Sequence, residues 1–198
     1  GKLGWRELMP SSDLDLVFVY QVPAGMYASD GRRPLPPGQY FARLSQRLIN
    51  SLTALTAEGR LYEVDMRLRP SGNKGPLAVA LDGFVRYQEN DAWTWEHMAL
   101  TRARVLAGPE PLCRCVREAI ERVLTRPRDP VRLFQDAARM RARMAAEKPA
   151  DAPWDVKTLR GGLVDIEFIV QCLQLRHGRD HRGILAPGTA DALARIAA

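Results

Sequence analysis

Two aspartates one residue apart, Asp13 and Asp15, open a continuously apolar run that ends at Tyr20. The run is short and rich in Val, Leu and aromatic residues, a composition typical of a buried strand. Side chains two positions apart in a strand point to the same face, so the two carboxylates should lie side by side. At about 4 Å their repulsion costs about 4 kcal/mol when the effective dielectric constant is roughly 20. A cation should compensate, and hard divalent ions are the usual partners of such carboxylates.

A third acid lies in the segment 61–68, where apolar and polar side chains alternate strictly. This period of two predicts a strand with one face on the core and with Asp65 and Arg67 on the other face. If this strand lies beside the first one, Asp65 joins Asp13 and Asp15. Three carboxylates on neighbouring strands can hold two Mg²⁺ ions about 3.5–4 Å apart, as in phosphoryl and nucleotidyl transfer. The alternative interpretation is that the acids pair with the many nearby arginines.

The elements that position these acids are expected in the order strand, helix, strand. A Pro- and Gly-rich loop is expected at 23–38, followed by a helix that begins at Gln39 and stops before Gly59. One apolar stripe runs along this helix, made of Tyr40, Phe41, Leu44, Leu48, Ile49, Leu52 and Leu55. After a second loop, residues 77–80 favour a short extended segment.

The rest of the chain is predicted to be mostly helical. Residues 82–100 are expected to be helical, and 101–106 to form another strand or an extended stretch. The core candidates of that helix are Phe84, Tyr87, Trp93, Trp95 and Met98. Four further helices are expected at 110–124, 130–148, 163–176 and 189–198, with a linker at 149–153. The expected organisation is therefore a small α/β domain at 1–107 and a helical domain at 108–198.

The composition is that of an ordinary globular protein, with 198 residues, 46% hydrophobic and 26% charged. No apolar stretch approaches the roughly 20 residues that span a bilayer, and no signal peptide opens the chain. The three cysteines lack zinc-type spacing and are odd in number, which favours a reducing cytoplasm. A net charge of +6 attracts polyanions without choosing among nucleic acid, nucleotide phosphates and acidic proteins. Both ends of the chain read as the interior of a longer polypeptide.

A loop glycine and several cationic side chains occur in the same half of the chain as the acids. Gly4 precedes Asp13 by nine residues, and a loop glycine lets backbone amides approach a phosphate closely. Arg67 shares the strand face of Asp65, so a triphosphate is within its reach. The expected nucleotide contacts are Gly4, Ser12, Arg67, Arg69 and Lys157.

Specific strings occur in order along most of the chain. They are GKLG (1–4), EL (7–8), SDLDL (12–16), YEVDMRLRPSG (62–72), GPL (75–77), WTWEH (93–97), LTRAR (100–104), DVK (155–157) and GGLVDIEFIVQ (161–171). Together they resemble the glutamine synthetase adenylyltransferase family, which has two related nucleotidyltransferase halves. One half adenylylates glutamine synthetase, and the other removes the AMP by phosphorolysis. Glu63, Ser71 and the string WTWEHMAL resemble the adenylylating, C-terminal half.

The resemblance implies an α+β architecture, with a DNA polymerase β-like nucleotidyltransferase domain containing a mixed sheet and a helical domain truncated at its C-terminus. It implies Asp13, Asp15 and Asp65 as the catalytic, Mg²⁺-binding triad. ATP would donate AMP to a tyrosine of glutamine synthetase, lowering its activity in nitrogen regulation. The implied partners are glutamine synthetase and the PII signalling protein in the cytoplasm, with no nucleic acid or membrane. One departure is Trp5, where the family often has Gly or Ser.

Other functions compete with this one. The chain could be the related AMP-removing half, a nucleotide-binding module without turnover, or a nucleic-acid nucleotidyltransferase, which predicts strongly salt-dependent oligonucleotide binding.

Several further residues have both a structural and a functional interpretation. Asp165 and Glu167 near a helix start stabilise the helix dipole, or they face a cleft with Lys157 and position a substrate. His97 is interpreted as hydrogen-bonded structure rather than a catalyst. Cys113 and Cys115 are expected to be inert helix residues. The arginines of 130–148 are expected to form a solvated face.

Overall fold

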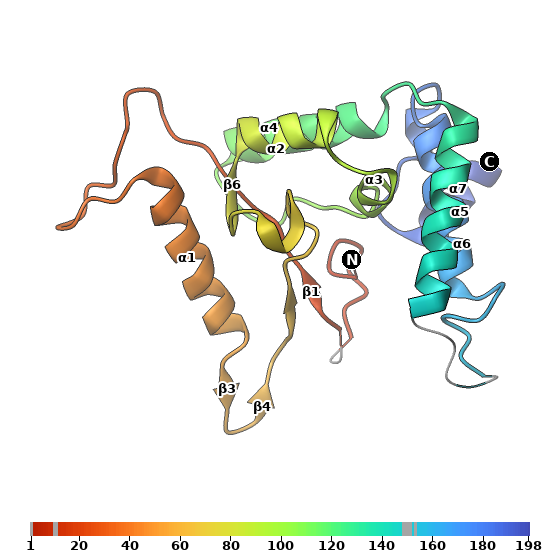
Figure 1. Ribbon diagram of the computed structural model, residues 1–198, viewed down its shortest axis with the longest axis horizontal. Coiled ribbons are helices and arrows are strands. Elements are labelled where there is room, and N and C mark those ends of the chain that lie inside the picture. Colours follow the sequence, from red (N-terminus) through yellow and green to blue (C-terminus); the bar gives the residue numbers. More distant parts are fainter. Residues whose placement is uncertain (1, 10–11, 148–151, 153) are drawn as a thin grey trace. The chain divides into compact units, whose positions relative to one another are not determined.

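The computed structural model describes residues 2–9, 12–147, 152 and 154–198 and contains both helices and strands (Figure 1). Its strands are β1 (Leu14–Asp15), β2 (Phe18–Tyr20), β3 (Leu55–Thr56), β4 (Gly59–Arg60), β5 (Val64–Asp65) and β6 (Ala78–Ala80). Its α-helices are α1 (Pro37–Leu52), α2 (Leu81–Asn90), α3 (Thr94–Leu100), α4 (Glu110–Leu124), α5 (Pro130–Glu147), α6 (Leu163–His177) and α7 (Thr189–Ala197). Short 3₁₀ turns lie at Gly72–Lys74 and Arg182–Ile184. This mixed content is compatible with the expected α+β class.

The chain forms two compact units. The first contains residues 1–92 and 106–116, and the second contains residues 93–105 and 117–198. All six strands belong to the first unit, and most of the helical residues belong to the second. The expected domain division at 107/108 stays a prediction, because compact contacts do not define an independently folding domain. The expected linker at 149–153 falls outside the described residues, apart from Ala152.

The apolar run that follows Asp13 forms two short strands with different partners. β1 pairs in parallel with β5, and β2 pairs in parallel with β6. The amides of Leu14 and Leu16 donate to the carbonyls of Glu63 and Asp65 at 2.8 and 3.0 Å. The sequence therefore predicts the strand pairing correctly, although the second strand is much shorter than 61–68. A turn in which Arg69 N donates to Met66 O ends it early.

Helix α1 begins at a proline, a position where the missing amide hydrogen costs nothing. Its inner face packs on β6, and Phe41 stacks on Tyr20 of β2 with ring centroids 4.4 Å apart. Ser45, also on this face, is buried. Only part of the predicted apolar stripe lies on this face, and the rest of it remains exposed to solvent.

The helical segment expected at 82–100 is confirmed for most of its residues, but it is divided into α2 and α3. The amides of Asp91 and Ala92 both donate to Tyr87 O, which closes α2. Trp93 N donates to the Glu96 carboxylate at 2.8 Å, which starts α3 with a capping interaction. Trp93 is therefore 71% exposed rather than in the core. The extended stretch expected after α3 begins instead with turns at Thr101 and Arg102, and it joins no strand.

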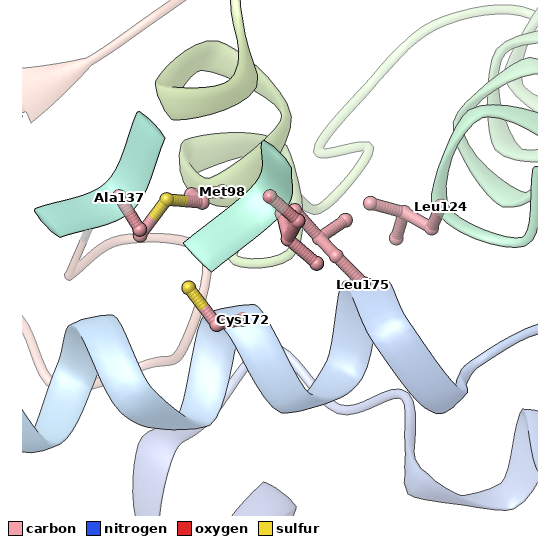
Figure 2. Packing of buried hydrophobic residues seen from close by; sticks show 6 residues of the cluster. Met98, Leu124, Ala137, Cys172 and Leu175 are labelled. Carbon is pink, nitrogen blue, oxygen red and sulfur yellow. The ribbon is translucent and has the colours of Figure 1, made fainter. Parts of the chain in front are cut away.

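The core of the second unit is a cluster contributed by four helices (Figure 2). Its buried members are Met98, Leu124, Leu133, Ala137, Cys172 and Leu175. Burial raises the pKa of the Cys172 thiol to about 11, so this cysteine stays a protonated, apolar core residue. A smaller cluster of Val170, Ala186 and Ala192 joins α6 to α7. The helices expected beyond residue 108 are confirmed to within one or two residues at their ends. No helix in the described residues combines the length and hydropathy required to cross a bilayer.

The position of Leu175 predicts a large stability loss on truncation. Leu175 is 1% exposed in the α6 core, so Leu175→Ala should destabilise the protein by about 2–5 kcal/mol through lost transfer energy and a residual cavity. Urea unfolding measures the difference, and Val131→Ala, at a 64% exposed position on α5, is the control. A loss at Leu175 no larger than that at Val131 would contradict this description of the core.

Candidate functional site: an acidic pair on two parallel strands

The β1–β5 register brings two of the three predicted acids side by side. Asp15 and Asp65 are direct partners in the parallel pairing. Both are half-buried, and Asp13 lies exposed immediately before β1. Because register partners in a parallel pair project to the same face, the carboxylates of Asp15 and Asp65 are neighbours. The register therefore brings Asp15 and Asp65 together, while Asp13 directly precedes β1 and has no register partner on β5.

Arg67 provides the cation that this concentration of negative charge requires. Its Nε donates to Asp65 Oδ2 at 2.7 Å, its amide donates to Asp65 Oδ1 at 2.8 Å, and Nη2 lies 2.5 Å from Oδ2. These hydrogen bonds hold the pKa of the Asp65 carboxyl below its usual range, against the opposite effect of partial burial. The same contact raises the pKa of Arg67, with smaller contributions from the charges of Asp15 and Asp13. One guanidinium thus interacts electrostatically with all three acids.

A divalent cation such as Mg²⁺ requires several oxygen ligands that converge on one point. Among the described residues, no group of three His, Cys, Asp or Glu side chains converges closely enough to hold a metal ion. Asp65 is instead paired with arginine, as the alternative interpretation expected. The donor chemistry nevertheless fits a hard cation, since carboxylates occupy adjacent positions on two strands. The Arg67 side chain is 72% exposed, so it can turn away from Asp65 without disturbing packed neighbours.

Two predicted nucleotide contacts are engaged by their own loops. Ser12 is buried, and its Oγ accepts a hydrogen bond from Met9 N at 3.1 Å. Arg69 Nη1 donates to Met66 O at 2.7 Å, and its Nε donates to Gly75 O at 3.4 Å. Arg69 therefore holds together the turn that follows β5. Gly4 lies in a turn of the same unit, where Glu7 N donates to Lys2 O.

The fifth predicted contact, Lys157, belongs to the second unit, in the loop before α6. Its amide donates to Asp155 Oδ1, and its carbonyl accepts from Val164 N at 3.1 Å. A Cβ on Gly162 would lie 2.6 Å from Val156 O, and Gly161 adopts a φ of +81°. The glycine pair is therefore required by a tight backbone approach at the start of α6.

Asp165 and Glu167 have cationic partners within the second unit. Asp165 accepts from Gly161 N at 2.5 Å and from Arg141 Nε of α5, and Arg141 also donates to Thr158 O at 2.9 Å. The Gly161 and Arg141 hydrogen bonds lower the pKa of the Asp165 carboxyl. Glu167 pairs with Arg102 at 2.9 Å. The structure thus favours the structural interpretation of this motif, and the expectation that Arg141 is merely solvated is wrong.

His97 is fully buried in α3, where no substrate could reach it. Its Nδ1 lies 3.2 Å from Arg128 Nη1. Because a guanidinium only donates, Nδ1 is the acceptor in this contact. Burial lowers the pKa of Arg128 to about 10, with a smaller contribution from Arg126. His97 is therefore hydrogen-bonded structure.

The partners of these buried polar groups were not identified from the sequence alone. A helix that begins with Asp165 and Glu167 signals that cations are required nearby, yet the chain contains many arginines. Arg102 and Arg141 are selected by the way the helices pack. No local pattern distinguishes them from their solvated neighbours.

Comparison with known proteins places this chain, with its acidic pair on parallel strands, in a family of adenylyltransferases. Residues 1–118 match the glutamate-ammonia ligase adenylyltransferase family. A relative from Mesorhizobium japonicum is 50% identical over 197 residues, covering all of this chain and 20% of its own length. Relatives from Rhodopseudomonas palustris and Brucella suis are 52% and 55% identical, covering 98% and 86% of this chain and 20% and 17% of themselves.

Each of these relatives is named a bifunctional glutamine synthetase adenylyltransferase/adenylyl-removing enzyme. The chain belongs to the glutamate-ammonia ligase adenylyltransferase family. It spans about a fifth of the length of the curated relatives it matches.

The Arg141–Asp165 pair predicts a pH-dependent contribution to stability. Asp165→Asn should lower the free energy of unfolding by about 1.5–3 kcal/mol at pH 7, the scale of a hydrogen bond to a charged group. The pKa of Asp165 is lowered on folding, so this contribution is present above the unfolded pKa of about 3.9 and is lost as the pH falls through the lower, folded pKa.

Urea unfolding of the wild-type protein and Asp165→Asn between pH 7 and pH 2.5 measures this contribution. The difference between the two proteins should shrink below about pH 4. Asp30→Asn, in the exposed loop before α1, is the control. A difference between wild type and Asp165→Asn that does not change with pH would contradict the assignment of Asp165 as a charged structural partner.

Proposed function

We propose that this chain is a Mg²⁺-dependent nucleotidyltransferase module that transfers AMP from ATP to a tyrosine of glutamine synthetase. The single observation that supports it most is the direct pairing of Asp15 with Asp65 across two parallel strands, with Asp13 two residues away. The names of the relatives supply the acceptor protein. We infer that the first unit has the polymerase β-like nucleotidyltransferase fold, since that fold presents acids on neighbouring strands. The reaction would take place in the cytoplasm, with PII as a regulatory partner.

The acids would hold divalent cations through their carboxylate oxygens. Asp13, Asp15 and Asp65 are the proposed ligands, because Asp15 and Asp65 are register partners and Asp13 lies two residues before Asp15. When bound, Mg²⁺ would supply charge neutralisation for the triphosphate and would lower the pKa of the attacking hydroxyl. A free tyrosine has a pKa of about 10, so lowering it is required near neutral pH.

Arg67 would exchange one anionic partner for another. In the structure its guanidinium neutralises Asp65. With a nucleotide present, its exposed side chain can move to the phosphates, and its planar donors suit their oxygens. Arg69 would act less directly, because its guanidinium is engaged with loop carbonyls. Gly4, Ser12 and Lys157 remain proposed nucleotide contacts.

We propose the adenylylating direction because the strings YEVDMRLRPSG and WTWEHMAL resemble the adenylylating half of the family. The names of the relatives include both the transfer and the removal of AMP. Removal of AMP is therefore measured alongside its transfer. Phosphate-dependent release of AMP from adenylylated glutamine synthetase, without the forward reaction, would assign the chain to the removing half.

Removing one acid should abolish transfer without unfolding the protein. In the full chain, Asp13→Asn or Asp15→Asn should reduce labelling of glutamine synthetase from [α-³²P]ATP by roughly 10²-fold or more, the scale of losing a charge-stabilising group. Asp30→Asn, in the exposed loop before α1, is the matched control and should label normally. Chelation by EDTA should abolish labelling, and excess Mg²⁺ should restore it.

Two results would contradict the proposal. Undiminished labelling by Asp13→Asn would show that the acid pair does not support the chemistry. Binding of Mg²⁺ and ATP without any transfer by the wild-type chain would instead favour a nucleotide-binding module.

A further inference from the structure

The outer face of α1 exposes three large apolar side chains in a row. Tyr40, Leu44 and Leu48 are 42%, 50% and 47% exposed, although a spacing of four residues places them on one face of the helix. Phe41, on the neighbouring face, stacks on Tyr20 of β2 and meets the Tyr40 ring edge-on, while α1 packs on β6. Scattered exposed apolar residues need no explanation, but a continuous row on one helix marks an interaction surface.

The same helix bears positive charge without compensation. No Asp or Glu occurs from residue 31 to residue 57, a segment that contains four arginines. Arg43 and Arg47 lie beside the apolar row, at three-residue spacing from Tyr40 and Leu44. Helix α5 offers a contrast, because its Arg132, Arg139, Arg141 and Arg143 all pair with acids. Among the described residues, neither Arg43 nor Arg47 has an ion-pair partner.

We propose that Tyr40, Leu44, Leu48, Arg43 and Arg47, here called the α1 face, form the docking surface for the acceptor protein. The partner would present an acidic, apolar patch. Tyr and Arg are the residue types enriched at protein interfaces, and unpaired surface arginines steer an acidic partner. This inference rests on the proposed function, since it makes glutamine synthetase the occupant.

Two features favour a protein occupant over other polyanions. Nucleic acid phosphates require cations but not a row of leucines beside them. The α1 face also belongs to the same compact unit as the acids, and α1 packs on β6, which pairs with the strand β2 that continues the acidic run. An acceptor held there would be bound by the unit that contains the reacting site.

The test uses direct binding and steady-state transfer in the full chain. Arg43→Glu/Arg47→Glu should raise the KM for glutamine synthetase about tenfold, and Leu44→Ser/Leu48→Ser should have a similar effect, as expected for interface charges and apolar anchors. The KM for ATP and the kcat at saturating acceptor should stay within about twofold of wild type, because α1 bears none of the acids. Biolayer interferometry without nucleotide should show the same loss of affinity.

Matched controls separate docking from folding and from general charge. Arg86→Glu/Arg114→Glu makes the same charge change at two exposed arginines of the first unit that have no ion pair among the described residues. Val131→Ser removes an exposed apolar side chain elsewhere. Both controls should bind and transfer like wild type, and all variants should keep the wild-type unfolding midpoint.

The outcomes distinguish this inference from the proposed function. Asp13→Asn should bind glutamine synthetase normally while failing to transfer AMP, so loss of chemistry leaves the docking test intact. Equal binding by wild type and both α1-face variants would overturn the docking assignment. The docking assignment would also be overturned if Arg43→Glu/Arg47→Glu weakened binding only to a 20-nucleotide DNA or to vesicles of anionic lipid. Self-association of the wild-type protein that both α1-face variants abolish would overturn it too.

Discussion

Repulsion between carboxylates at one end of a two-strand pairing is the interaction on which this account depends. The parallel register of β1 and β5 places Asp15 beside Asp65, and the chain order places Asp13 just ahead of them. Such a concentration of charge is costly unless a cation compensates it. Arg67 does so in the structure, and its guanidinium is the group that a nucleotide-bound cation would displace. The same residues thus compensate this charge within the protein and form the basis of the proposed cation site.

In the second unit, the acidic side chains are compensated by arginines from other segments of the chain. Its acids at the start of α6 are bound by arginines from α5 and from the segment after α3. These ion pairs are partly shielded from solvent. They connect α6 to α5 and to the segment after α3, which are distant from it in the sequence. The motif GGLVDIEF therefore has a mechanical explanation: the glycines allow a tight approach, and Asp165 secures it.

The sequence predicts these two units unequally, for physical reasons. Strict alternation in 61–68 and the acidic apolar run identify neighbouring strands, because a period of two has few structural interpretations. Helix α1 is predicted, but its apolar stripe does not reveal which part is buried, since burial depends on what packs against it. The break at Trp93 is a capping event among residues that otherwise favour helix. The arginine partners of Asp165 and Glu167 are fixed by tertiary packing, which no local pattern encodes.

Manganese binding followed by electron paramagnetic resonance tests the central claim most directly, because Mn²⁺ can replace Mg²⁺ and reports its own bound fraction. In the presence of a non-hydrolysable ATP analogue, the wild-type chain should bind Mn²⁺. Asp15→Asn and Asp65→Asn should each lose that binding, because each removes one of two adjacent carboxylates. Equal Mn²⁺ binding by wild type and both variants would show that these acids serve only as partners for Arg67.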